Sequence, residues 1–177
     1  MTPPRNVFIT GRPGVGKTTA IEGTLKLLDM PVNGFTTGEM RENGRRVGFR
    51  IDALDGEGAV MAHVDFDSHV RVSKYRVDVD AVERIAVTAL RRAIREGTPA
   101  VVDEAGKMEL ACDAFVDALL EVVEADIPVL GTMHVGRGSV TDRIRERQDT
   151  KVVQIIRENR DALPARLAEM MRQAMSI

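Results

Sequence analysis

A glycine-rich segment near the N-terminus limits the possible folds more than any other part of this 177-residue sequence. Residues 11–18 read Gly-Arg-Pro-Gly-Val-Gly-Lys-Thr and fit the pattern G-x-x-x-x-G-K-[ST]. A short β-branched and aromatic run, 6–10, precedes them, and residues 17–29 carry apolar side chains at helical spacing. A glycine-rich loop between a buried strand and an amphipathic helix is typical of sites that bind phosphate groups. We therefore predict a phosphate-binding loop of the Walker A type in an α/β fold.

Each fixed position of this loop has a mechanical role. Glycines allow successive backbone N–H groups to surround phosphate oxygens without interference from a Cβ atom. We predict Lys17 as a catalytic residue, because it starts the helix and extends toward the β- and γ-phosphates. The Thr18 hydroxyl is placed to ligate Mg²⁺. The predicted nucleotide-binding residues of the loop are Gly11, Arg12, Pro13, Gly14, Val15, Gly16, Lys17, Thr18 and Thr19.

The remainder of the chain alternates strand and helix patterns. We predict strands over 100–102, 127–133 and 152–156, and helices over 79–97, 114–124, 140–147 and 161–175. Asp80 and Glu83 have the spacing of a capping box at a helix start. The alternation favours a mainly parallel central sheet flanked by helices. With no repeat and no linker in the sequence, we expect a single domain over residues 1–177.

Residues 34–65 differ from the rest because they hold short alternating runs separated by turn residues. The runs are 34–40, 46–54 and 59–65, and the first turn contains Asn43-Gly44. Asn-Gly between two strand-like runs is a strong hairpin signal, since both residues accept positive φ. We predict an antiparallel meander inserted into the α/β domain.

Composition limits the cellular location and the binding partners that we expect for the protein. A formal net charge of −2 produces no strong field toward nucleic acid or a membrane. Cys112 is the only cysteine, so an intramolecular disulfide is impossible and a zinc–thiolate site is disfavoured. The N-terminus lacks the apolar core of a signal peptide, and no apolar stretch has the length of a bilayer span. We expect a cytoplasmic protein without a membrane partner.

Two carboxylates, Asp103 and Glu104, end the predicted strand that begins at Ala100. In a phosphate-loop protein the aspartate would hold Mg²⁺ from the strand beside the loop. Side chains alternate in direction along a strand, so Glu104 points to a different position from Asp103. That position suits the activation of a water for in-line attack on the γ-phosphorus. A kinase activates a hydroxyl of its substrate instead, so Glu104 favours hydrolysis. The alternative for both carboxylates is an ordinary solvated strand end.

The stretch 103–110, Asp-Glu-Ala-Gly-Lys-Met-Glu-Leu, resembles a segment of the small nucleoside-triphosphatases of the thermophile and cancer-related type. Matching pieces occur at 34–37, 42–44, 46–49, 130–132 and 158–161. The resemblance implies a RecA-like phosphate-loop domain and the hydrolysis of nucleoside triphosphates to diphosphate and phosphate. It also implies Mg²⁺ as cofactor and broad tolerance of the base. The sequence departs from the family pattern at Ala105, where a larger aliphatic residue is usual, and at Ser73, where glycine is expected.

The resemblance extends the predicted site beyond the loop. It implies Glu104 as the catalytic glutamate beside Asp103, and Lys107 follows them in the same segment. A catalytic Lys107 would neutralise charge that develops on the transferred phosphoryl group, whereas the alternative is a solvated loop lysine. The further nucleotide-binding residues are Val102, Asp103, Glu104, Ala105, Gly106, Lys107, Met108 and Glu109, and the predicted metal ligands are Thr18 and Asp103.

Several polar residues leave alternatives open. Thr132 and His134 end a predicted strand. Either they sense the γ-phosphate, or their polar groups form hydrogen bonds with the backbone. Four arginines that follow this strand have two interpretations: one of them acts as an arginine finger, or they form a solvated helix face. They are Arg137, Arg143, Arg145 and Arg147. The hairpin is basic through Arg41, Arg45, Arg46 and Arg50. Phe49 is the one aromatic residue among them, too few to stack successive bases, so a nucleic-acid partner is disfavoured.

The leading function is thus Mg²⁺-dependent hydrolysis of nucleoside triphosphates such as ATP and GTP. A kinase of a small metabolite or nucleoside, with its acceptor held by the insert, is one alternative. A nucleotide-gated binding module is the other. The sequence leaves the physiological substrate, the base preference and the oligomeric state open.

Overall fold

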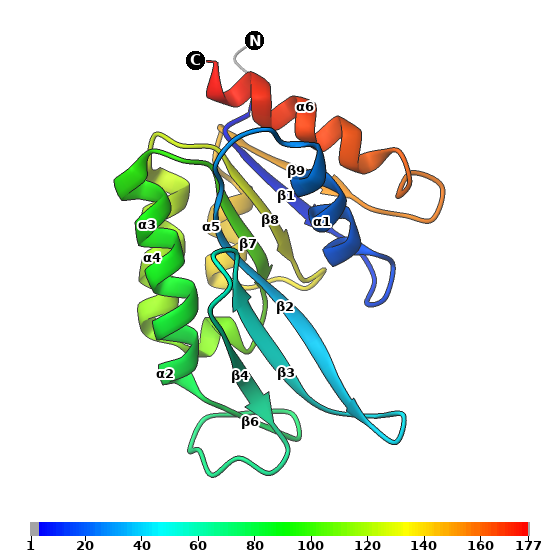
Figure 1. The fold of residues 1–177 in the computed structure, drawn as a ribbon, viewed down its shortest axis with the longest axis vertical. Helices are drawn as coiled ribbons and strands as arrows, with labels where there is room; N and C mark the ends of the chain where they lie inside the picture. The colour runs from blue at the N-terminus through cyan, green and yellow to red at the C-terminus, as the bar shows by residue number, and fades with distance from the viewer. Residues whose placement is uncertain (1–3, 177) are drawn as a thin grey trace.

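The structure is a computed structural model and describes residues 4–176. Its strands are β1 (Asn6–Thr10), β2 (Asn33–Glu42), β3 (Arg45–Ala53), β4 (Gly58–His63), β5 (Arg71–Val72), β6 (Tyr75–Val77), β7 (Ala100–Ala105), β8 (Val129–Met133) and β9 (Thr150–Gln154). Within these residues they form one nine-stranded sheet in the order β5-β6-β4-β3-β2-β7-β8-β1-β9 (Figure 1). Pairing is parallel from β2 through β9 in this order, and antiparallel from β5 to β2. The α/β class is confirmed, with a mixed sheet in place of a mainly parallel one.

The strand order places β8 between β1, which precedes the glycine-rich loop, and β7, which carries Asp103 and Glu104. β8 pairs with β1 through Gly131 and Phe8, and with β7 through Gly131 and Val102. Our expectation that Asp103 follows the strand beside the loop is therefore wrong. β8 fits between the two because Gly131 has no side chain: a Cβ atom there would lie 2.4 Å from the Phe8 ring.

The helices are α1 (Lys17–Leu27), α2 (Val79–Val82), the π-helical turn η1 (Glu83–Val87), α3 (Thr88–Glu96), the 3₁₀ turn η2 (Glu109–Ala111), α4 (Asp113–Glu124), α5 (Ser139–Arg145) and α6 (Leu163–Met175). The predicted helices are confirmed to within a few residues, and η2 was not predicted. The predicted cap is wrong: Asp78, not Asp80, accepts the Ala81 N–H at 3.0 Å. None of the helices within residues 4–176 is long and apolar enough to cross a membrane.

Helices cover both faces of the parallel half of the sheet (Figure 1). Val7, Val101 and Leu130 pack with residues of α1 and α6 on one face. Phe8, Val102 and Val129 pack with residues of η1, α3 and α4 on the other. Strands covered on both faces carry mainly apolar residues, which explains why their runs were readable as buried strands. The carboxyl ends of β1, β7 and β8 meet at one edge of this half.

The antiparallel half confirms the predicted meander. Asn43 and Gly44 have φ of +48° and +77°, as the hairpin between β2 and β3 requires. The small β5–β6 hairpin was not predicted. Its turn contains Ser73 with φ of +58°, a left-handed conformation that glycine adopts more readily. Serine at this position therefore hid the turn signal.

Candidate active site

The loop between β1 and α1 has the geometry that its glycines predict. Gly14 and Gly16 have φ of +75° and +113°, values that residues with a Cβ atom rarely adopt. Gly11 is needed for close packing, because a Cβ atom there would lie 2.8 Å from the carbonyl oxygen of Ile155. Lys17 Nζ donates to the Gly11 carbonyl oxygen at 3.2 Å. Gly16 provides no side-chain cap for α1, so the first N–H groups of the helix are open to an anion.

Asp103 lies in the second half of β7 and is only 1% exposed. Its Oδ1 accepts the Thr132 hydroxyl at 2.6 Å, whereas its buried Oδ2 has no hydrogen-bond partner within residues 4–176. Burial raises the pKa of this carboxyl, while the hydroxyls of Thr132 and Thr18 and the Lys17 ammonium lower it. The two loop residues therefore lie near a buried carboxylate that has one open oxygen, and Thr132 supports that carboxylate from β8.

Glu104 and Glu109 lie next to each other around Gly106. A Cβ atom on Gly106 would lie 2.6 Å from Glu104 Oε1 and 2.9 Å from Glu109 Oε2. Glu104 is half-buried, whereas Glu109 is buried in η2. Burial, reinforced by the charges of Glu104 and Asp103, raises the pKa of Glu109 to about 8, although backbone N–H groups lower it. Burial therefore favours the protonated form of Glu109, which lies in the interior beside Glu104.

A cavity of about 710 Å³ opens between the loop and the β2–β3 hairpin, and we call it the phosphate cavity. Its volume is within the usual range of small-molecule sites. The predicted residues that line it are Gly11, Pro13, Gly14, Gly16, Lys17, Thr18, Thr19 and Glu104. His134 also lines it, together with residues of the hairpin that the sequence analysis had not assigned to the site: Thr37, Gly38, Glu39, Arg46 and Phe49. The site thus draws on both halves of the sheet.

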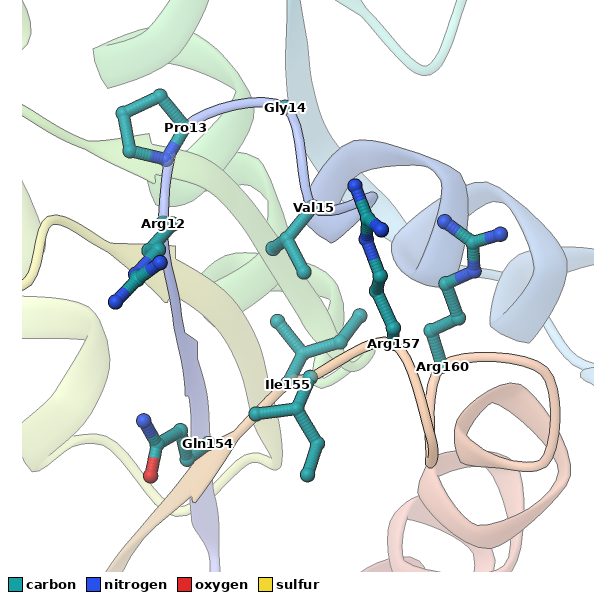
Figure 2. Close-up of a pocket in the computed structure, with 9 residues that line it drawn as sticks. Arg12, Pro13, Gly14, Val15, Gln154, Ile155, Arg157 and Arg160 are labelled. Atoms are coloured by element: carbon teal, nitrogen blue, oxygen red, sulfur yellow. The ribbon is translucent and has the colours of Figure 1, made fainter.

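A second cavity of about 670 Å³, the side cavity, lies on the other side of the loop (Figure 2). One wall consists of the predicted residues Arg12, Pro13, Gly14 and Val15, and the other of Gln154, Ile155, Ile156, Arg157 and Arg160. Figure 2 shows Arg157 and Arg160 extending toward the start of α1. Sequence reasoning missed these arginines. The signal was two basic residues shortly after a strand, and it becomes informative only once β9 is known to pair with β1.

The geometry brings a phosphate loop, a buried aspartate and a half-buried glutamate to one edge of the sheet. A sequence profile of the family described as NTPase matches residues 6–168. The chain belongs to this NTPase family.

Relatives in the NTPase family match nearly the whole chain. The nucleoside-triphosphatase THEP1 of Thermofilum pendens is 42% identical over 171 residues, which cover 93% of this chain and 93% of the relative. The human cancer-related nucleoside-triphosphatase is 38% identical over 175 residues, covering 90% of this chain and 92% of the relative. The crystal structure of THEP1 from Aquifex aeolicus has a TM-score of 0.86 and 29% identity, covering 94% of this chain and 98% of that one. The resemblance inferred from residues 103–110 is confirmed.

The other predicted site residues of this NTPase family member lie outside both cavities. Val102 and Ala105 are buried in the core, and Met108 is half-buried against it. Lys107 is exposed on the turn between β7 and η2. From the segment after Asp103, only Glu104 lines the phosphate cavity in the described part of the chain.

The four arginines after β8, which were the candidates for an arginine finger, contact other groups of the protein. Arg145 donates to the carbonyl oxygens of His134 and Gly136, and so holds the loop that follows β8. The other three form ion pairs: Arg137 with Asp142, Arg143 with Glu124, and Arg147 with Asp149. None of the four lines the phosphate cavity in the described part of the chain.

Proposed function

We propose that this chain hydrolyses nucleoside triphosphates to nucleoside diphosphate and phosphate, with Mg²⁺ as cofactor and little discrimination between bases. The observation that carries the proposal is the position of Glu104 on the wall of the cavity that Lys17 and Thr18 also line. A carboxylate there lies beside the phosphates that the loop would bind. The family and the names of the relatives support the hydrolase class.

The donor groups at the end of β7 fit Mg²⁺. Asp103 Oδ2 is buried without a hydrogen-bond partner in the part of the chain described, and the Thr18 hydroxyl lies near the same carboxylate. Within residues 4–176 no cluster of three or more His, Cys, Asp or Glu side chains could hold a metal by itself. Mg²⁺ commonly takes one or two protein oxygens and completes its shell with phosphate and water. We propose that Thr18 and Asp103 hold the ion, which would neutralise phosphate charge when bound.

Glu104 is our candidate for the general base. Water attacks the γ-phosphorus, a new P–O bond forms, and the bond to the β–γ bridging oxygen breaks. The proton of the water goes to the Glu104 carboxylate, and the diphosphate leaves with the bridging oxygen. Lys17 exchanges its contact with the Gly11 carbonyl for the phosphates. Lys107 stays a hypothesis, because it is exposed and does not line the phosphate cavity.

We place the nucleoside in the side cavity. Pro13 and Gly14 line both cavities, so one nucleotide can extend from one to the other across the loop. Val15 and Ile155 provide apolar contact, and the guanidinium planes of the arginines suit the face of any base. Stacking does not read the hydrogen-bonding edge that distinguishes bases. This arrangement supports broad base tolerance.

We also assign the parallel half of the sheet to the RecA-like class, with the antiparallel strands as an insertion into a single domain. The continuity of the sheet from β5 to β9 supports this assignment. A cytoplasmic location is our proposal as well, in keeping with the single, buried thiol of Cys112.

Phosphate release from ATP, GTP, CTP and UTP, measured without any acceptor and with either Mg²⁺ or EDTA, tests the function. We expect release from all four nucleotides with Mg²⁺ and none with EDTA. Release from a single nucleotide would overturn the base tolerance. Diphosphate that forms only after a hydroxyl acceptor is added, with the phosphoryl group on that acceptor and no free phosphate, would replace the hydrolase with a kinase.

A further inference from the structure

The β2–β3 hairpin places one arginine on the wall of the phosphate cavity. Arg46, on β3, lines this cavity together with Lys17 and Glu104. Within the described residues the other basic side chains of the hairpin, Arg41, Arg45 and Arg50, do not line it. The position of Arg46 therefore separates it from the group of hairpin arginines that the sequence suggested for nucleic acid.

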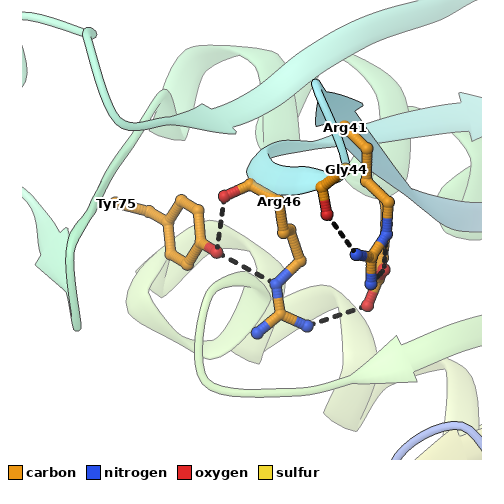
Figure 3. Close-up of polar contacts among 5 residues, drawn as sticks. Arg41, Gly44, Arg46 and Tyr75 are labelled. Carbon is orange, nitrogen blue, oxygen red and sulfur yellow. Dashed lines mark hydrogen bonds and ion pairs between the residues drawn. The ribbon is translucent and has the colours of Figure 1, made fainter.

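Two hydrogen bonds, drawn in Figure 3, and two aromatic rings hold the Arg46 side chain. Nε donates to the Tyr75 hydroxyl at 2.9 Å, and Nη1 donates to Glu39 Oε1 at 2.8 Å. The guanidinium carbon lies 5.2 Å from the centroid of the Phe49 ring and 5.9 Å from that of Tyr75. A donor held in this way needs little reorganisation when negative charge develops beside it, which is the main requirement for electrostatic catalysis.

The charge around Arg46 is not fully neutralised. Glu39 also accepts from Arg41 Nη2 at 2.8 Å, so one carboxylate serves two guanidinium groups. No hydrogen bond engages Arg46 Nη2 within residues 4–176. The cluster thus has an excess positive charge and a free donor next to a cavity that receives phosphates. Arginine is the residue best suited to phosphate oxygens, because it offers several N–H donors in one rigid plane.

We infer that Arg46 is a catalytic arginine supplied by the same chain, which donates from Nη2 to an oxygen of the γ-phosphoryl group during its transfer to water. The proton of the attacking water goes to Glu104, the leaving diphosphate keeps the electron pair of the broken bond, and Arg46 stays protonated throughout. The inference rests on the proposed function. It assigns to the antiparallel insertion the arginine role for which the sequence offered only candidates after β8.

Arg46→Ala should lower the single-turnover rate of ATP hydrolysis by about 10³-fold, the lower range for removal of an arginine finger. The affinity for ADP should stay unchanged, because the free Nη2 contacts only the transferred group. Affinity for ADP with Mg²⁺ and aluminium fluoride, a mimic of that group in transfer, should fall with the rate. Arg45→Ala is the matched control, since Arg45 is the exposed neighbour on the same strand. It should leave all three quantities unchanged.

A purely structural role gives a different pattern. If Arg46 only holds the hairpin to Tyr75, Arg46→Ala would lower the melting temperature and weaken ADP and its aluminium fluoride complex equally. That result, or a wild-type rate in Arg46→Ala, would overturn the inference. Should the alanine variant not fold, Arg46→Lys keeps the charge without the planar fork and is expected to lose rate at an unchanged melting temperature. Failure of the proposed function would be seen separately, as a wild-type protein that releases no phosphate from any nucleotide.

Discussion

The two halves of the sheet hold their charges differently. In the parallel half Asp103 and Glu109 are 1% and 3% exposed, and burial raises both pKa values. In the antiparallel half many charged side chains are exposed and form ion pairs, as between Arg50 and Asp52. Buried carboxylates destabilise a fold unless a proton or cation compensates them, whereas exposed ion pairs contribute little in either direction. The difference agrees with our proposal that the parallel half binds a cation with phosphates, while the antiparallel half presents side chains to them.

Lys17→Ala should have the largest effect, because it removes the mobile cation of the parallel half. We expect hydrolysis to be abolished and triphosphate binding to weaken, since Lys17 would contact the β- and γ-phosphates in both the ground state and the transition state. Phosphate release and calorimetric titration measure the two quantities. Lys26→Ala, an exposed lysine later on α1, is the control. Near-normal turnover in a folded Lys17→Ala protein would mean that the loop does not hold the phosphates.

Arg160→Ala should separate binding of the base from binding of the phosphates within the parallel half. Loss of a guanidinium that stacks on the base is expected to raise KM for ATP by about 10-fold at an unchanged kcat. Hydrolysis of inorganic tripolyphosphate, which has no base, should be unaffected. Arg166→Ala on the exposed face of α6 serves for comparison. Equal losses with ATP and tripolyphosphate would place Arg160 at the phosphates, and no loss with either would move the nucleoside elsewhere.

Glu109→Gln should change stability in a pH-dependent way. The pKa of about 8 in the folded protein lies above the value of 4.5 expected for the unfolded chain, so the folded protein binds the additional proton between these values. The stabilising contribution of this proton is complete below pH 4.5 and declines as pH rises toward 8. Glutamine is neutral at every pH and removes the decline. The variant should therefore gain stability relative to wild type toward pH 8, on the order of a few kcal/mol.

Urea unfolding at pH 5 and pH 8, without nucleotide or metal, measures this difference. Glu22→Gln provides the control, because Glu22 is an exposed carboxylate on α1. Parallel stability profiles for wild type and Glu109→Gln would show that the buried acid is already ionised at neutral pH. Such a result would remove the contrast between the two halves of the sheet.

The sequence predicts those parts of the site that depend on local geometry. The positive φ of Gly14 and Gly16, and of Asn43 in the hairpin turn, are requirements of a few consecutive residues and leave a readable pattern. The place of Asp103 in the sheet was mispredicted, because strand order depends on contacts between residues far apart in the sequence, such as Gly131 against the Phe8 ring. Arg46 was recognisable only as one of several arginines. Its role depends on tertiary contacts with Tyr75, far away in the sequence.

The role of Glu104 in activating water is the central claim, and Glu104→Gln tests it most directly. The substitution preserves the shape of the side chain but removes its basic carboxylate. Calorimetric affinity for the triphosphate and single-turnover hydrolysis are measured on both proteins. We expect the rate to fall by ~10²-fold or more, the scale of a lost general base. Affinity should persist or improve, because the loop, Lys17 and Mg²⁺ still hold the ground state. A parallel fall in affinity and rate, or no change in either, would contradict the account.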